Sequence, residues 1–211
     1  MESDGSSVAT PVSGEANGKP QERRGSEGSD LTWPTHAAGG IASLWLLAIV
    51  PGVVTHGNVG SWAVLAAGAA LLPDLDASRS KIRSLALGPV RPFDPLGALI
   101  YVTLGHRGPL HSLPGLALFG LIVALPAALA WGGASAAALL LGYGSHLALD
   151  AMTRHGVPLW PRRGPDGRWG FRHRCHLLPS RLCFVTGSSA EDVLQAVLFG
   201  LTLLLLLKNL I

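Results

Sequence analysis

The chain alternates between apolar stretches and polar loops, and the positive charge of the loops alternates as well. The apolar stretches cover about residues 36–54, 60–72, 110–131, 134–152 and 193–207. The loops after the first and third stretches contain no Lys or Arg, whereas those after the second and fourth contain five and seven. Because Lys and Arg concentrate in cytoplasmic loops, the pattern predicts an all-α, polytopic membrane bundle of about five transmembrane helices with a cytoplasmic N-terminus.

Two parts of this pattern are less regular. A transmembrane helix needs roughly 20 residues, so the stretch 60–72 would have to tilt, thin the bilayer locally or lie buried among its neighbours. The segment 95–104 is apolar but shorter still, and it is either a partial, re-entrant helix or a separate one. Pro114 and Pro126 are expected to bend the third stretch.

The composition supports a membrane protein. Hydrophobic residues make up 48% of the 211 residues and charged residues only 14%, against roughly 25% charged in soluble domains. Many of the 27 glycines lie inside apolar stretches, where small residues let helices approach closely. The net charge of +3 comes from loop residues that set topology and contact anionic lipid, so we expect the bilayer as partner and no nucleic acid.

Two segments are expected along the chain. Residues 1–31 are rich in Gly, Ser, Glu and Pro without apolar periodicity, which predicts a disordered polar tail. No apolar core closely follows Met1, so this tail is not a secretory signal peptide. Residues 32–211 are expected to form the membrane-embedded domain, located in the cell inner (cytoplasmic) membrane as a multi-pass protein.

Polar motifs rich in His and Asp stand at the ends of the apolar stretches. Their candidate ligands are His36, Asp74, Asp76, His106, His111, His146 and Asp150. The predicted topology brings all of these helix ends to the cytoplasmic side, where ionisable residues at membrane depth usually mark function. His56 falls on the opposite side, so we exclude it from the site.

Spacing within the motifs suits a metal site, with an ordinary structural alternative in each case. His146 and Asp150 are four apart and share one face of a helix, which fits two ligands or simply a hydrogen-bonded helix end. Asp74 and Asp76 share a face in extended chain, or Asp caps the next element. His106 and His111 flank a Gly-Pro turn that could fold the two imidazoles together.

Imidazole and carboxylate ligands suit zinc, manganese or iron, and the number of histidines favours zinc. Seven candidates exceed one tetrahedral shell. Either some of them orient the ligating histidines or the site holds more than one ion, which gives a range of one to three. Arg107 either stabilises charge on a phosphate or is an ordinary cytoplasmic anchor.

The two cysteines form a weaker candidate. Cys175 and Cys183 lie in the Arg-rich loop near His173 and His176, but their spacing matches no common zinc-finger pattern. Two unpaired loop thiols are therefore the favoured interpretation.

At the His/Asp motifs the sequence resembles the YdjM-like family, inner-membrane proteins inferred to be metal-dependent hydrolases. The matching segments are Thr35-His36 with Gly39-Gly40, Leu71 to Asp76, His106-Arg107-Gly108 with His111-Ser112, Gly142 to Asp150 with Thr153, Gly156 to Pro161, and Thr186-Gly187-Ser188 with Glu191. The family is similar, distantly, to zinc-dependent phospholipase C. The resemblance implies His36, Asp74, Asp76, His111, His146 and Asp150 as metal ligands and His106 as a ligand or acid/base.

The residues and the resemblance together predict an integral membrane hydrolase that cleaves a phosphoester at the cytoplasmic interface by metal-activated water. A phospholipid is one candidate substrate. His106 and Asp76 would move protons and Arg107 would stabilise the developing charge. Two alternatives stay open: a divalent-cation transporter, and a non-enzymatic scaffold with a structural metal whose loop 154–181 binds anionic lipid or a partner.

Overall fold

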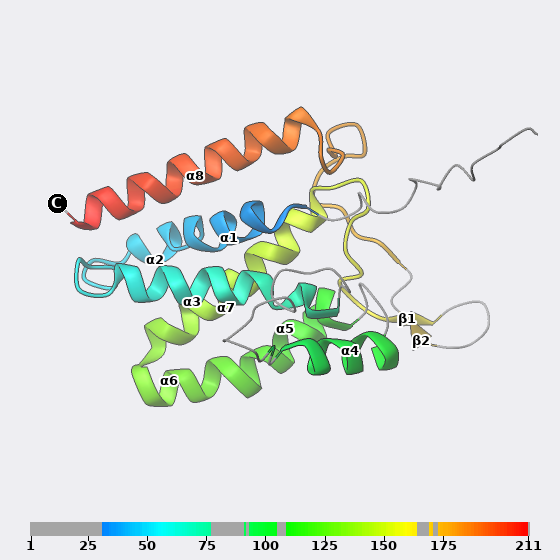
Figure 1. Cartoon of the computed structure of the whole chain (residues 1–211), viewed down its shortest axis with the longest axis horizontal. Helices are drawn as coiled ribbons and strands as arrows, with labels where there is room; N and C mark the ends of the chain where they lie inside the picture. Colours follow the sequence, from blue (N-terminus) through cyan, green and yellow to red (C-terminus); the bar gives the residue numbers. More distant parts are fainter. Residues whose placement is uncertain are drawn as a thin grey trace, which may run out of the picture.

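The computed structural model describes residues 31–76, 91, 93–104, 109–163, 169–170 and 173–210. The predicted tail up to residue 30, His106 and Arg107 therefore lie outside the described residues. The described part is helical except for one short hairpin, which confirms the all-α prediction (Figure 1).

The helices follow the apolar stretches closely. They are α1 (Trp33–Ala42), α2 (Trp45–Ala48), α3 (Val59–Leu71), α4 (Phe93–Leu104), α5 (Leu113–Phe119), α6 (Leu125–Trp131), α7 (Gly133–Ala151) and α8 (Ser189–Leu210). Two 3₁₀ turns, η1 (Pro73–Asp76) and η2 (Pro109–His111), and a π-helical segment, η3 (Gly120–Ala124), complete them. The hairpin pairs β1 (Arg162–Arg163) with β2 (Trp169–Gly170) in antiparallel register.

Two helices of the described part are long and apolar enough to cross a membrane. They are Leu113–Trp131, formed by α5, η3 and α6, and Ser189–Asn209 in α8. Most of their side chains face outward, as Leu129 does at 82% exposed, so they present an apolar surface suited to lipid. The first stretch is interrupted between α1 and α2, and α3 has 13 residues. The count of five membrane spans therefore stays a prediction.

The two prolines of the third stretch act differently from one another. Pro114 lies in the first turn of α5, which begins directly after the extended residue Ser112, and the missing N–H of proline is no loss there, so this proline begins a helix instead of bending one. Pro126 lies in the first turn of α6 and directly follows the π-helical segment. The continuous helix changes from α to π type at Gly120 and back to α at Leu125, next to this proline, because a proline inside a continuous helix leaves a carbonyl without its usual donor.

Helices α1, α3 and α7 form the centre of the bundle around one close backbone contact. A Cβ atom on Gly40 would lie 2.6 Å from the carbonyl oxygen of Ala66, and a Cβ on Gly142 would collide with that same oxygen. Only glycine allows α1 and α7 to approach α3 this closely. One helical turn further along these helices stand His36, Ala70 and His146, so the glycine contact sets the spacing of the site.

The ends of the helices gather at two opposite ends of the molecule (Figure 1). The start of α1, the ends of α3 and α7, the start of α8 and the β hairpin lie at one end. The connection from α2 to α3, the turn from α6 to α7 and the C-terminus lie at the other. His56 is exposed in the α2–α3 connection, at the end opposite to the predicted metal site. This position agrees with leaving His56 out of that site.

Candidate metal centre

Five of the predicted ligands come together in the interior of the bundle, from four separate segments. His36 comes from the first turn of α1, Asp74 from η1, His111 from η2, and His146 with Asp150 from the last turns of α7. His36, His111, His146 and Asp150 are completely buried, and the carboxylate of Asp74 is 13% exposed. We call these five residues the His/Asp cluster.

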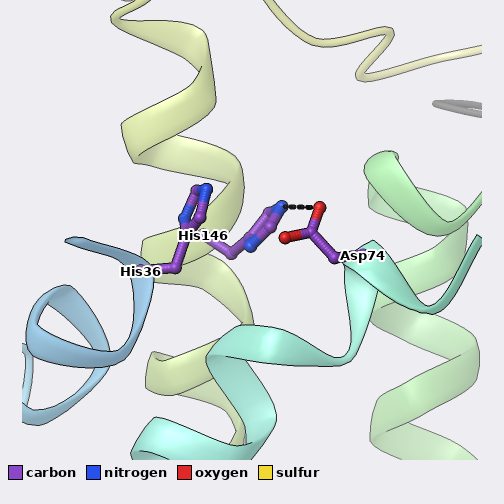
Figure 2. Close-up of side chains that lie close together, drawn as sticks. All are labelled: His36, Asp74 and His146. Atoms are coloured by element: carbon purple, nitrogen blue, oxygen red, sulfur yellow. Dashed lines mark ion pairs between the residues drawn. The ribbon is translucent and has the colours of Figure 1, made fainter. Parts of the chain in front are cut away.

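One carboxylate oxygen of Asp74 and one of Asp150 lie at similar distances from the same pair of imidazole nitrogens. The Nε2 atoms of His111 and His146 are 3.2 Å apart. Asp74 Oδ1 lies 3.5 Å from His111 Nε2 and 3.6 Å from His146 Nε2. Figure 2 shows the contact between Asp74 and His146. Asp150 Oδ2 lies 3.8 Å from His111 Nε2 and 3.6 Å from His146 Nε2.

These separations fit the donor set of a metal ion. A tetrahedral zinc ion with bonds of about 2.0–2.1 Å keeps its ligands about 3.3 Å apart, close to the values found here. By distance alone, two overlapping groups are candidates for holding an ion, one of His36, Asp74 and His146 and the other of His111, His146 and Asp150. In each group the ligand atoms lie within 4.8 Å of one another. The buried cluster can therefore hold a metal ion.

The backbone of α3 orients the ring of His146. Its Nδ1 lies 2.7 Å from the carbonyl oxygen of Ala70, and because a carbonyl only accepts, Nδ1 carries the proton and donates. The lone pair of the neutral ring is then on Nε2, the atom that faces His111 and both carboxylates. A metal-ligating histidine usually donates the N–H of its other ring nitrogen in this way, which fixes its tautomer and its orientation.

The cluster also differs from a simple hydrogen-bonded helix end. His146 Nε2 and Asp150 Oδ2 are 3.6 Å apart, beyond the ordinary range of a hydrogen bond. The rings of His36 and His146 are stacked with centroids 3.8 Å apart. Neither nitrogen of the buried His36 ring has a hydrogen-bond partner among the residues described, and a buried polar ring in that condition calls for a ligand.

His111 is positioned by contacts that the sequence did not single out. The hydroxyl of Tyr143 donates to the carbonyl oxygen of Leu110 at 2.6 Å, which ties η2 to α7. Ser112 donates to Pro109 O and accepts from Gly115 N, which caps α5 directly after His111. The available signal was periodicity: Tyr143 lies three residues before His146 and shares its helix face.

Asp74 is the acidic group nearest to solvent in the cluster. Burial alone would raise its pKa, but the positive charges that His146, His36 and His111 carry once they are protonated in acid, together with the contact with His111, hold the pKa well below its ordinary value. The carboxylate is therefore ionised at neutral pH, as a metal ligand has to be.

The remaining candidates have different outcomes. Asp76 ends η1, and its side chain is outside the described part. Cys183 is buried and donates to backbone carbonyls, and Cys175 is half-buried. Neither cysteine belongs to the groups of possible ligands found within the described residues, so a cysteine zinc site has no support from the structure.

The fold and the site define a helical membrane protein with a buried His/Asp cluster that can hold a metal ion. The sequence model of the YdjM inner membrane protein family matches residues 31–210, and the chain belongs to that family. The uncharacterized protein YvsG of Bacillus subtilis (strain 168) is 33% identical over 180 residues, which cover 82% of this chain and 91% of that protein. No solved structure matches the chain.

Proposed function

We propose that the protein is an inner-membrane metal-dependent hydrolase that cleaves a phosphoester at the cytoplasmic face of the membrane. The observation that carries the proposal is the arrangement of two imidazole nitrogens, from His111 and His146, 3.2 Å apart, with a carboxylate oxygen of Asp74 and one of Asp150 at 3.5 to 3.8 Å from both. Imidazole and carboxylate ligands favour zinc in this position.

A bound divalent ion supplies acidity to water and neutralises charge on a phosphoryl oxygen. The residues of the chain do the rest. Asp74 faces the partly open side of the cluster and orients what enters. His106 and Asp76 hold or move protons, and Arg107 binds the phosphate with its planar fork. The roles of His106, Arg107 and Asp76 rest on their place in the sequence motifs.

The position of the cluster within the molecule favours an interfacial substrate. It lies at the end of the bundle that also carries the loop after α7, where Arg154, Arg162 and Arg181 are exposed. Basic loops favour the cytoplasmic side and attract anionic headgroups. A phosphate ester in the headgroup plane, such as that of a phospholipid, would reach the site without leaving the membrane surface.

The same position counts against the cation transporter. A transporter is expected to have ligands along the depth of the membrane, with its binding site near the midplane, whereas the ligand groups found among the described residues gather at one end. His56, near the other end, is exposed in a loop and has no place in these groups.

A direct test measures hydrolysis by detergent-purified protein loaded with zinc or manganese. The substrates are aryl phosphate monoesters and diesters together with vesicles of anionic phospholipid. Asp150→Asn keeps the size of the side chain but removes its charge, and His56→Ala is the matched control. We expect turnover by wild type and His56→Ala and its loss in Asp150→Asn. Metal-loaded wild type with no turnover on any of these substrates would reject the proposal.

A further inference from the structure

The planes of the three imidazole rings restrict which of them can share an ion. The lone pair of an imidazole nitrogen lies in the plane of its ring, and a ligated ion lies close to that plane, about 2 Å from the nitrogen. Two rings therefore share one ion only if their planes meet near both nitrogens.

His111 and His146 satisfy this condition. Their planes are inclined by 63°, and their Nε2 atoms are 3.2 Å apart. Asp74 Oδ1 and Asp150 Oδ2 complete the same arrangement at 3.5 to 3.8 Å from these nitrogens. Each of these two oxygens therefore lies at a ligand separation from both nitrogens.

The rings of His36 and His146 do not satisfy this condition for sharing one ion. Its ring is stacked on that of His146, with an angle of only 18° between the planes and 3.8 Å between the centroids (Figure 2). Nearly parallel planes at stacking distance do not meet within a metal–nitrogen bond length of either ring. His146 also cannot serve a second ion through its other nitrogen, because Nδ1 donates to Ala70 O.

Asp150 connects the two positions. Its Oδ2 faces His111 and His146, whereas its Oδ1 lies 3.5 Å from His36 Nε2. Carboxylates commonly use their two oxygens for two neighbouring ions, which in two-metal sites lie about 3.5–4 Å apart. Asp74 also offers an atom within 4.8 Å of the ligand atoms of His36 and His146.

We infer that the cluster holds two divalent ions bridged by Asp150, one bound by His111 and His146 and the other by His36. The inference rests on the metal site of the proposed function but not on hydrolysis. The ring nitrogens of the buried His36, which have no hydrogen-bond partner among the described residues, would then include a ligand of an ion. The opposing arrangement is a single ion, with His36 holding Asp150 in place.

The test counts ions in the full-length protein. Detergent-purified chains are stripped of metal, reloaded with Mn²⁺ and analysed for manganese per chain, and electron paramagnetic resonance detects coupling between neighbouring Mn²⁺ ions. Wild type is compared with His36→Ala, with the milder His36→Asn and with the control His56→Ala. Circular dichroism verifies the helical content of each variant.

We expect two ions per chain and a coupled spectrum for wild type and His56→Ala. Both His36 variants should retain one ion with the spectrum of isolated Mn²⁺. One ion per wild-type chain, or two in either His36 variant, would overturn the inference. Turnover by a protein with one ion would leave the proposed function standing, whereas a wild-type chain that binds no ion would reject both.

Discussion

Neighbouring residues in the first turn of α1 point into two buried polar clusters that are satisfied in different ways. Thr35 belongs to a group around Glu191, which also includes Thr32 and Gly187 and which we call the Glu191 cluster. His36, the next residue, belongs to the His/Asp cluster. Glu191 is 2% exposed and His36 is fully buried, so both side chains had to give up water on folding.

The Glu191 cluster is saturated with hydrogen bonds. One carboxylate oxygen accepts from Thr32 N at 2.7 Å, Thr32 Oγ1 at 3.0 Å and Thr35 Oγ1 at 3.2 Å. The other accepts from Gly187 N at 2.6 Å. Here the protein itself supplies the donors, and the carboxylate joins the N-terminal ends of α1 and α8, where helix dipoles favour negative charge.

The His/Asp cluster places its nitrogens and oxygens 3.2 to 3.8 Å apart instead. Most of these distances are too long for good hydrogen bonds and suit ligands around an ion. Burial alone therefore does not mark a site. A satisfied buried carboxylate holds helices together, whereas an unsatisfied imidazole beside carboxylates is arranged for something that binds.

Among the variants of the two clusters, Asp150→Asn should have the largest effect, and this effect should be on metal affinity. The substitution removes the charge that the inferred bridge requires, so metal affinity should fall by more than about 100-fold, beyond the loss caused by changing groups behind the ligands. Titration of metal-free protein with zinc and an indicator measures this. Affinity within a factor of about two of wild type would mean that Asp150 is not a ligand.

Glu191→Ala should instead lower the stability of the protein and leave its metal binding unchanged. Four hydrogen bonds to the buried carboxylate are lost, and the free energy of unfolding should drop by about 2–3 kcal/mol. Thermal unfolding in detergent measures it, and metal bound per folded chain should not change.

Glu191→Gln is the matched variant for this test. It keeps one acceptor oxygen but sets an amide N–H₂ against a donor, so it should lose about half as much as the alanine variant. If Glu191→Ala loses metal before it loses stability, the Glu191 cluster is part of the site and the contrast fails.

A smaller effect should follow from Gly142→Ala, because the added methyl group meets Ala66 O and pushes α7 away from α3. The shift separates His146 from Ala70 O and from α1, so we expect about tenfold weaker metal binding together with about 1–3 kcal/mol lower stability. Gly144→Ala is the control, since nothing lies within 4 Å of a Cβ at that glycine. Equal behaviour of the two variants would show that the glycine contact does not set the geometry.

The smallest effect is expected for Tyr143→Phe, which removes the hydrogen bond to Leu110 O. The loss should be about 1 kcal/mol in stability and a few-fold in metal affinity, because η2 still carries His111 through the Ser112 cap. Thermal unfolding in detergent measures the stability, and zinc titration with an indicator measures the metal affinity. A loss as large as that of Asp150→Asn would place Tyr143 among the groups that contact the ion.

By itself the sequence determined where the helices form and which residues stand at their ends. Apolar stretches and helix spacing are local properties, so His146 and Asp150 were placed on one face of α7 and His56 away from the site. The alternating basic loops also indicated that the ends carrying His36, Asp74, His111 and His146 meet, because each helix reverses direction.

Only the tertiary structure decided how these ends fit together. The contact of Gly40 and Gly142 with Ala66, the carbonyl of Ala70 that orients His146, and the stacking of His36 on that ring join segments far apart in the chain. Distances and ring planes between helices depend on how side chains of several helices pack at once, and no periodicity along one segment contains that information. For the same reason, no pattern along the chain indicated that Thr35 and His36, which are adjacent, belong to two different clusters.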